Sequence, residues 1–136
     1  MIAPRKKLWS TPEAVIAAAI ELAEINENDI VYDIGCGDGR VVTLIARDTG
    51  ARCGGIEIDA DRAQVAEQMV AEASCSQLVD IRVGNALAEL YDDPLPSIVF
   101  LYLAPRGYRI ILSTLVQIAN RRGKPLRVLT YTMGFE

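Results

Sequence analysis

An apolar segment that runs directly into three alternating glycines constrains this chain more than any other feature. The segment is Val31–Ile34, and the glycines are Gly35, Gly37 and Gly39. Glycines lack the Cβ atoms that would hold a ligand away from the backbone, and they accept the positive φ angles that a sharp strand-to-helix turn needs. A helix that begins near Gly39 points its unpaired N–H groups into the same space. The pattern therefore predicts a cradle for a nucleotide-like ligand; the alternative is an ordinary tight connection between a strand and a helix.

Two acidic residues end neighbouring predicted strands and indicate which ligand the turn binds. Asp33 lies two positions before the first glycine, and Glu57 ends the next apolar run, about 20 residues past the turn. A dinucleotide-binding turn reads G-x-G-x-x-G, whereas here the third glycine comes one residue earlier. A carboxylate at Asp33 repels a pyrophosphate and suits an ammonium or a sulfonium, and one at Glu57 is a usual acceptor for ribose hydroxyls. The spacing disfavours a nicotinamide-binding domain, and a surface acid is the alternative for Glu57.

With these residues the chain resembles a class I methyltransferase that depends on S-adenosyl-L-methionine. Asp33–Gly39 resembles the first motif of that family, Glu57 its ribose-binding acid, and Val83–Ala86 the segment after the third strand that contacts the adenine. Asn85 stands where the family more often has Asp. Its amide can still accept from the adenine amino group and donate to a ring nitrogen, whereas the alternative is a turn residue without ligand contact.

A narrower likeness is to the small archaeal protein lysine methyltransferases and their mitochondrial relatives. The segments that carry it are Thr11-Pro12, Ile30–Arg40, Gly55–Asp59 and Val99–Leu103, within roughly residues 8 to 132. This resemblance implies transfer of a methyl group to a lysine of a partner protein by in-line displacement. It also implies that Trp9, Ser10 and Thr11 fold over the cofactor, although a tryptophan beside a helix start is as often a hydrophobic staple.

The motifs and the resemblance together give a set of candidate site residues. Tyr102, near the end of the fourth predicted strand, is the candidate catalytic residue, because its ring could line an amine channel by cation–π contact; a core or rim tyrosine is the alternative. Cys36 is expected to be a small residue beside the cofactor, because the Pro-Cys pair of cytosine-type methyl transfer is absent after the fourth strand, as is the Asn/Asp-Pro-Pro-Tyr signature. The candidate cofactor-binding residues are Thr11, Asp33, Gly35, Cys36, Gly37, Glu57, Ile58, Asn85 and Ala86.

Composition limits the remaining chemistry. The 136 residues are enough for one domain, and the absence of histidine excludes Ser-His-Asp and Cys-His mechanisms. The net charge of −4 argues against sequence-independent nucleic-acid binding. Three cysteines without C-x-x-C spacing predict no metal site and a reducing, intracellular location, cytoplasmic or mitochondrial. No apolar run approaches the length of a membrane span.

Charge is distributed unevenly along the chain. Residues 1–93 hold 8 basic and 17 acidic side chains, whereas residues 94–136 hold 6 basic and 1 acidic. Solubility and charge at a helix C-terminus explain the basic excess most simply.

Hydrophobic periodicity and turn residues predict alternating helices and strands. The expected helices cover about 12–25, with Thr11 as N-cap, 39–47, 60–73 and about 110–122, and the expected strands cover 29–34, 53–58, 78–83, 97–103 and 126–131. Nearly unbroken apolar strands indicate a parallel sheet that is covered on both faces, and the alternation within 78–83 indicates an edge strand. Right-handed crossovers then predict a three-layer, Rossmann-like α/β fold with a doubly wound sheet of order 3-2-1-4-5, and the ligand above the carboxyl ends of strands one and four.

The class I family normally continues with a helix and an antiparallel strand pair. We therefore interpret residues 1–136 as a single S-adenosylmethionine-binding domain that is truncated at its C-terminus, because an uncovered fifth strand would be an exposed apolar edge. Two other functions stay open: a small-molecule methyltransferase, and a non-catalytic cofactor-binding module that needs a partner chain.

Overall fold

The computed structural model describes residues 11–90, 94–102 and 108–131 and shows alternating strands and helices. The helices are α2 (Glu13–Ala23), α3 (Arg40–Thr49), α4 (Ala60–Glu72), α5 (Ala86–Glu89) and α6 (Tyr108–Arg122); the strands are β1 (Ile30–Ile34), β2 (Arg52–Glu57), β3 (Val79–Val83), β4 (Ile98–Tyr102) and β5 (Arg127–Tyr131). Every predicted element is present, with ends within about two residues of those expected. The short helix α5 was not predicted, because four residues are too few to show a helical period.

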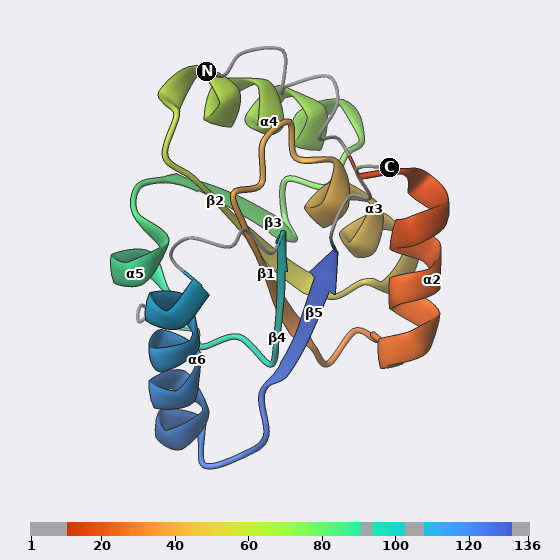
Figure 1. The fold of residues 1–136 in the computed structure, drawn as a ribbon. Helices are drawn as coiled ribbons and strands as arrows, with labels where there is room; N and C mark the ends of the chain where they lie inside the picture. Colours follow the sequence, from red (N-terminus) through yellow and green to blue (C-terminus); the bar gives the residue numbers. More distant parts are fainter. Residues whose placement is uncertain (1–10, 91–93, 103–107, 132–136) are drawn as a thin grey trace, which may run out of the picture.

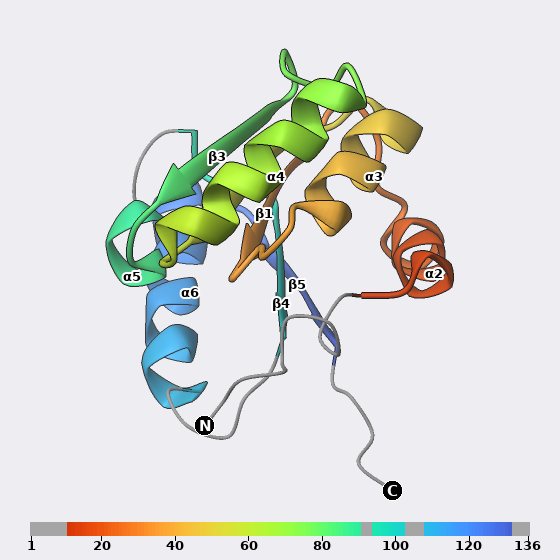
Figure 2. The same cartoon turned by 90° about the horizontal axis from the view of Figure 1, so that it is seen from above.

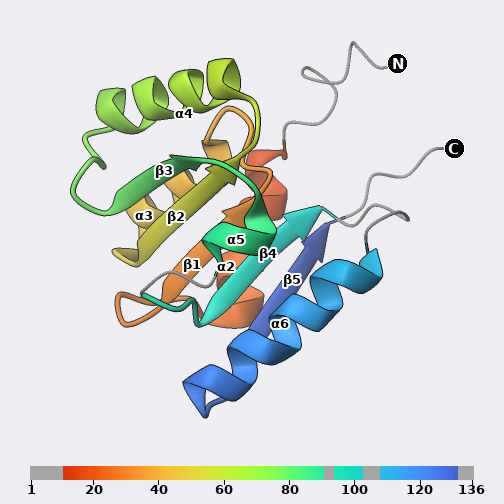
Figure 3. The same cartoon turned by 90° about the vertical axis from the view of Figure 1, so that its left-hand side faces the viewer.

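The strands form one parallel sheet in the order β3-β2-β1-β4-β5, which confirms the predicted order (Figure 3). Because all strands run the same way, the carboxyl ends of β1, β2 and β4 meet at one end of the sheet. β3 lies at an edge, as its alternation predicted. No antiparallel strand occurs within the described residues, and residues 132–136 lie outside them.

Helices cover the two faces of the sheet, with α2, α3 and α4 on one side and α5 and α6 on the other (Figures 1 and 2). Alternate strand residues serve the two layers. Val31 and Phe100 pack into the cluster under α2–α4, whereas Tyr32 and Val99 belong to the clusters on the α6 side. This double coverage is the reason why the central strands are apolar almost throughout.

The first helix starts later than its sequence signals predicted. Pro12 is extended, with φ −63° and ψ 147°, and its carbonyl accepts the N–H groups of Val15 and Ile16, so Pro12 is the N-cap and makes no side-chain cap. The prediction of Thr11 as N-cap is therefore wrong by one position. At the other end Glu24 adopts a left-handed conformation with φ 51°, which stops the helix before residue 25.

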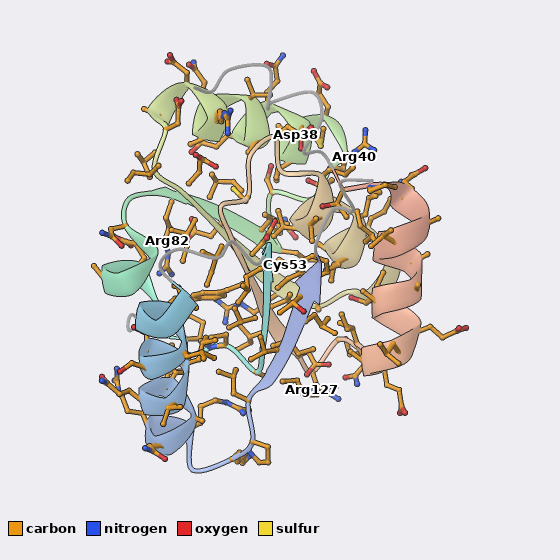
Figure 4. The ribbon with its side chains drawn as sticks, in the orientation of Figure 1. Asp38, Arg40, Cys53, Arg82 and Arg127 are labelled. Atoms are coloured by element: carbon orange, nitrogen blue, oxygen red, sulfur yellow. The ribbon has the colours of Figure 1, made fainter. Side chains whose placement is uncertain are left out.

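A buried polar network ties the amino ends of the central strands together. Ser97 Oγ donates to Asp29 Oδ1 (2.9 Å) and accepts the N–H of Ile30 (2.9 Å). Arg127 donates to the same carboxylate and to the carbonyl of Ala23, and Figure 4 shows it at the start of β5. Part of the basic excess of the second half of the chain therefore serves internal hydrogen bonds.

Candidate functional site

The turn between β1 and α3 lies at the carboxyl end of the sheet, and part of its backbone is exposed there. Gly35 and Gly37 have positive φ angles of 74° and 55°, and a Cβ atom built on either would meet no atom within 4 Å. The N–H groups of Gly35 and Cys36 both donate to the carbonyl of Ile56, at 2.8 and 3.1 Å, so the turn is fastened to β2. The first two glycines thus form the open cradle that the sequence predicted.

The third glycine has a different task from the one expected. Gly39 is the N-cap of α3 with φ 82°, and a Cβ atom there would lie 2.9 Å from Ala66 Cβ in α4. Since real Cβ atoms do not approach so closely, Gly39 allows α3 and α4 to pack against each other. Its missing side chain is required by the packing of α3 on α4.

Glu57 connects the glycine turn to the start of α4. Its side chain is only 5% exposed, so the alternative of a surface acid is wrong. Oε1 accepts the N–H of Gly37 (2.9 Å) and Oε2 accepts the N–H of Asp59 (3.1 Å). A carboxylate held by two N–H groups keeps further lone pairs for hydroxyl donors, and here they lie beside the open turn.

Asp33 is equally buried but has different surroundings. It pairs in register with Gly55 of β2 and Phe100 of β4, and among the described residues no N–H or O–H donates to its carboxylate. Burial, and then the nearby carboxylates of Glu57 and Asp38, raise the pKa of Asp33 well above its usual value. Asp33 therefore lies near the carboxyl end of β1, buried but not tied up by a hydrogen-bond donor among the described residues.

Cys36 fills the space above Gly55. A Cβ atom on Gly55 would lie 2.7 Å from Cys36 Sγ and 2.9 Å from Ile81 Cδ1, so β2 needs glycine at this point. Burial, followed by the charges of Asp33 and Glu57, raises the pKa of the Cys36 thiol. The thiol therefore stays protonated and is a poor nucleophile.

The strand ends next to Glu57 carry the other candidate ligand contacts. Ile58 is 75% exposed, which is unusual for a large apolar side chain directly after a buried strand. Gly84 donates to the carbonyl of Glu57 (3.0 Å), which places the end of β3 beside it. The carbonyl of Asn85 accepts the N–H groups of the last turn of α5, whereas its side chain is exposed, and Ala86 begins that helix.

The contacts of two predicted site residues, Thr11 and Tyr102, are described only in part. Thr11 is half-buried before α2, and among the described residues it makes no hydrogen bond to the glycine turn. Tyr102 ends β4, next to the strand pair Ile34–Leu101 at the open end of the sheet, but its side chain lies outside the described part. Residues Trp9, Ser10 and Leu103–Pro105 also lie outside it.

Asp38, in the glycine turn, and Asp59, two residues after Glu57, are acidic neighbours of the candidate site that the sequence analysis did not single out. Asp38 Oδ1 accepts the N–H of Arg40 at the start of α3 (3.1 Å), and Figure 4 shows both side chains there. Asp59 Oδ1 accepts the N–H groups of Asp61 and Arg62 at the start of α4. An acidic residue just before a helical pattern was the available signal.

A hollow of about 180 Å³ lies away from the turn, on the other face of β2 and β3. Arg82, which is labelled in Figure 4, lies 5.5 Å over the ring of Tyr32 and pairs with Asp80 at 2.9 Å. The Tyr32 hydroxyl donates to the carbonyl of Pro94 (2.7 Å). These polar groups are matched internally, so the glycine turn remains the candidate site.

Within residues 11–90, 94–102 and 108–131, no group of three or more His, Cys, Asp or Glu side chains is arranged to hold a metal ion. In the same part of the chain, every helix is too short or too polar to span a membrane.

Comparison with known proteins gives matches to methyltransferases. Residues 11–81, just over half of the chain, match the model of a family described as Histone methylation protein DOT1. A Protein-lysine N-methyltransferase of Saccharolobus islandicus (strain REY15A) is 36% identical over 76 residues, which are 55% of this chain and 47% of that protein. The chain thus spans about half the length of this curated relative.

Two solved structures extend the likeness over nearly the whole chain. An RNA methyltransferase from Salinibacter ruber, in complex with S-adenosylhomocysteine, superposes with a TM-score of 0.70 at 33% identity, over 93% of this chain and 78% of that one. A SAM-dependent methyltransferase from Thiobacillus denitrificans, also in complex with S-adenosylhomocysteine, has a TM-score of 0.69 at 18% identity, over 95% and 48% of the two chains. The second likeness shows the fold alone.

Proposed function

The chain belongs to the family described as Histone methylation protein DOT1, and from this premise we propose that it transfers a methyl group from S-adenosylmethionine to a lysine amine of a partner protein. The family match and the Saccharolobus islandicus relative support the lysine acceptor, and the cofactor is supported by the pair of buried carboxylates, Asp33 and Glu57, at the ends of adjacent strands beside an open glycine turn. This arrangement suits an adenosine attached to a cationic amino acid.

The residues present fit that cofactor. Glu57 would accept the ribose hydroxyls, Asp33 would face the positive charge, and the backbone of Gly35 and Gly37 leaves room for close approach. The exposed side chain of Ile58 would cover one face of the adenine, with Asn85 and Ala86 at its edge. S-adenosylmethionine supplies an electrophilic methyl group when bound, so the main demand on the protein is to align the acceptor.

A lysine acceptor must reach the methyl group as a neutral amine. Its ordinary pKa is about 10.4, and an apolar channel lowers that value by disfavouring the charged form. We propose that Tyr102 lines this channel, since its backbone lies at the end of β4 beside the turn. Water can take the proton, which agrees with a chain that contains no histidine.

RNA methylation is the second candidate, because the Salinibacter ruber structure is 33% identical over 93% of the chain. The family match and the Saccharolobus islandicus relative favour a protein substrate. We also propose an intracellular site of action, since Cys36, Cys53 and Cys75 are free buried thiols.

Calorimetric titration tests the cofactor assignment. We expect S-adenosylhomocysteine to bind, NAD not to bind, and Glu57→Ala to weaken binding of S-adenosylhomocysteine at least about tenfold, because it removes a charge-assisted hydrogen bond and frees the turn. Glu67→Ala, in an exposed glutamate of α4, is the matched control and should leave the affinity unchanged. Tighter binding of NAD would overturn the assignment.

Labelled methyl donor in a cell extract tests the acceptor. We expect label in material that protease removes and ribonuclease leaves, and on lysine after hydrolysis. Label that only ribonuclease removes would assign an RNA substrate, and label confined to small metabolites would assign a small-molecule enzyme. If no label is transferred although the protein binds S-adenosylhomocysteine in the calorimetric titration, the protein would be assigned as a non-catalytic cofactor-binding module.

A further inference from the structure

The three carboxylates at the turn differ in how they are solvated. Glu57 accepts two backbone N–H groups and Asp38 accepts one, at the start of α3. Asp33 accepts none from the described residues, although it is as buried as Glu57. A buried carboxylate that lacks donors favours its neutral form, because nothing replaces the water that the charge has lost.

The groups that face Asp33 do not offer a compensating positive charge. The charges of Glu57 on β2 and Asp38 in the turn act on Asp33, and the charge of Asp33 acts in turn on the thiols of Cys53 and Cys36. From β4 its register partner is the apolar Phe100. Among the described residues no lysine or arginine acts on it, so within this part of the chain no cation compensates the charge of the Asp33 carboxylate.

We propose that Asp33 holds a proton while the cleft is empty and releases it to solvent when the cationic end of S-adenosylmethionine lies beside it. This inference rests on the proposed function. Cofactor binding is then coupled to release of a proton, and Asp33 selects cationic adenosine ligands over neutral ones. The bound cation supplies the interaction that stabilises the carboxylate, while Glu57 keeps its hydrogen bonds throughout.

The coupling has a definite sign. Below the pH at which the empty protein loses the Asp33 proton, binding must expel it, so affinity for S-adenosylmethionine rises with pH by up to about tenfold per pH unit. Above that pH Asp33 is already ionised and the affinity becomes independent of pH. A neutral adenosine ligand shows no such rise.

Calorimetry in buffers with different ionisation enthalpies measures the protons released. At pH 6.5 the ligand ammonium is protonated both free and bound, so its own titration does not interfere. We expect S-adenosylmethionine and S-adenosylhomocysteine to release a fraction of one proton from the wild-type protein. Methylthioadenosine, which keeps the adenosine but lacks both positive groups, should release none.

Two variants locate the proton. Asp33→Asn should bind S-adenosylmethionine without proton release, whereas Glu67→Gln, the exposed control, should behave as wild type. Binding of S-adenosylmethionine without proton release by the wild-type protein would overturn the inference but leave the proposed function standing, and that measurement needs no variant. Equal release from a folded Asp33→Asn variant would also overturn it. Failure of S-adenosylmethionine and S-adenosylhomocysteine to bind would overturn both proposals.

Discussion

Asp33 and Glu57 show that two carboxylates of equal burial acquire different chemistry from their partners. Each is 5% exposed, and both lie at the ends of adjacent strands. Two backbone N–H groups satisfy Glu57, whereas Asp33 has none among the described residues and a raised pKa. Glu57 thus holds the turn through its hydrogen bonds, whereas the protonation state of Asp33 depends on the charges beside it.

Asp33→Asn should stabilise the ligand-free protein, and the gain should increase with pH. Because burial raises the folded pKa of Asp33 above its ordinary value of 3.8, the wild type loses stability as pH rises from there to the folded value. Below pH 3.8 the two proteins should melt together, and at pH 7 the variant should melt roughly 3 °C higher or more. Thermal melts between pH 3.5 and 8 measure the difference.

Glu67→Gln is the control for this series, and its difference from wild type should stay flat with pH. A variant at Asp33 that is less stable than wild type at neutral pH would show that the carboxylate is charged and paired in the ligand-free protein.

At the level of elements, glycines decide how closely the segments around the turn approach each other. Gly39 brings α3 against α4, and Gly55 lets the turn lie on β2. Neither contact is local in sequence. The open turn therefore depends on helix and strand packing beneath it as much as on its own glycines.

Gly39→Ala should destabilise the protein more than Gly50→Ala, which is a matched change at the other end of α3. Both glycines have positive φ, 82° and 77°, so each alanine costs about 1–2 kcal/mol of backbone strain. Only at Gly39 would the new Cβ lie 2.9 Å from Ala66 Cβ; at Gly50 its nearest neighbour is Glu27 Cβ, at 3.5 Å. We expect an additional loss of about 1–3 kcal/mol in urea unfolding.

Ala66→Gly, added to Gly39→Ala, should recover only a small part of that additional loss: it removes the nearest atom, Ala66 Cβ, but leaves Ala66 Cα at 3.0 Å, and glycine inside α4 itself costs about 1 kcal/mol. If Gly39→Ala and Gly50→Ala lose equal amounts of unfolding free energy, backbone strain alone would explain the need for glycine. The helices α3 and α4 would then move apart slightly to accept the new Cβ atom.

For the whole molecule, the network around Asp29 links parts of the chain that are far apart in sequence. Its carboxylate joins the start of β1 to Ser97 before β4 and to Arg127 of β5, which also reaches the end of α2. These segments meet at the amino ends of the strands, opposite the glycine turn. The network therefore stabilises the sheet order without taking part in the site.

Asp29→Ala should cost more stability than Arg127→Ala. The Asp29 side chain is 8% exposed, and its loss leaves the N–H of Asn26 without its acceptor, removes one of the two acceptors of Ser97 Oγ and leaves Arg127 without its carboxylate, which predicts a loss of about 3 kcal/mol. Arg127 is 45% exposed, so solvent screens its charge and about 1 kcal/mol is expected. Denaturant titration of both variants checks the order; equal losses would assign the stability to the ion pair itself.

Local signals were enough to predict the order of the elements and the general position of the site. Apolar strands, the glycine spacing and the Gly-Pro stop after α6 each act over a few residues, and the handedness of the crossovers supplies the sheet order. The start of α2 was wrong by one residue, because the φ of proline suits both the first helical position and the extended conformation that Pro12 adopts with ψ 147°. The short α5 has too few residues to show a period.

The sequence by itself determined that two acids flank a glycine turn at the ends of neighbouring strands. The residue types and the apolar pattern of each strand lie within short stretches of the chain, and the handedness of the crossovers then gives the strand order. Only the tertiary structure decided that Glu57 is held by Gly37 and Asp59 while Asp33 is left without a donor among the described residues. It also decided that Gly39 serves the packing of α3 on α4. The reason is physical: solvation and close contact depend on atoms brought together from separate segments, and no spacing along the chain encodes them.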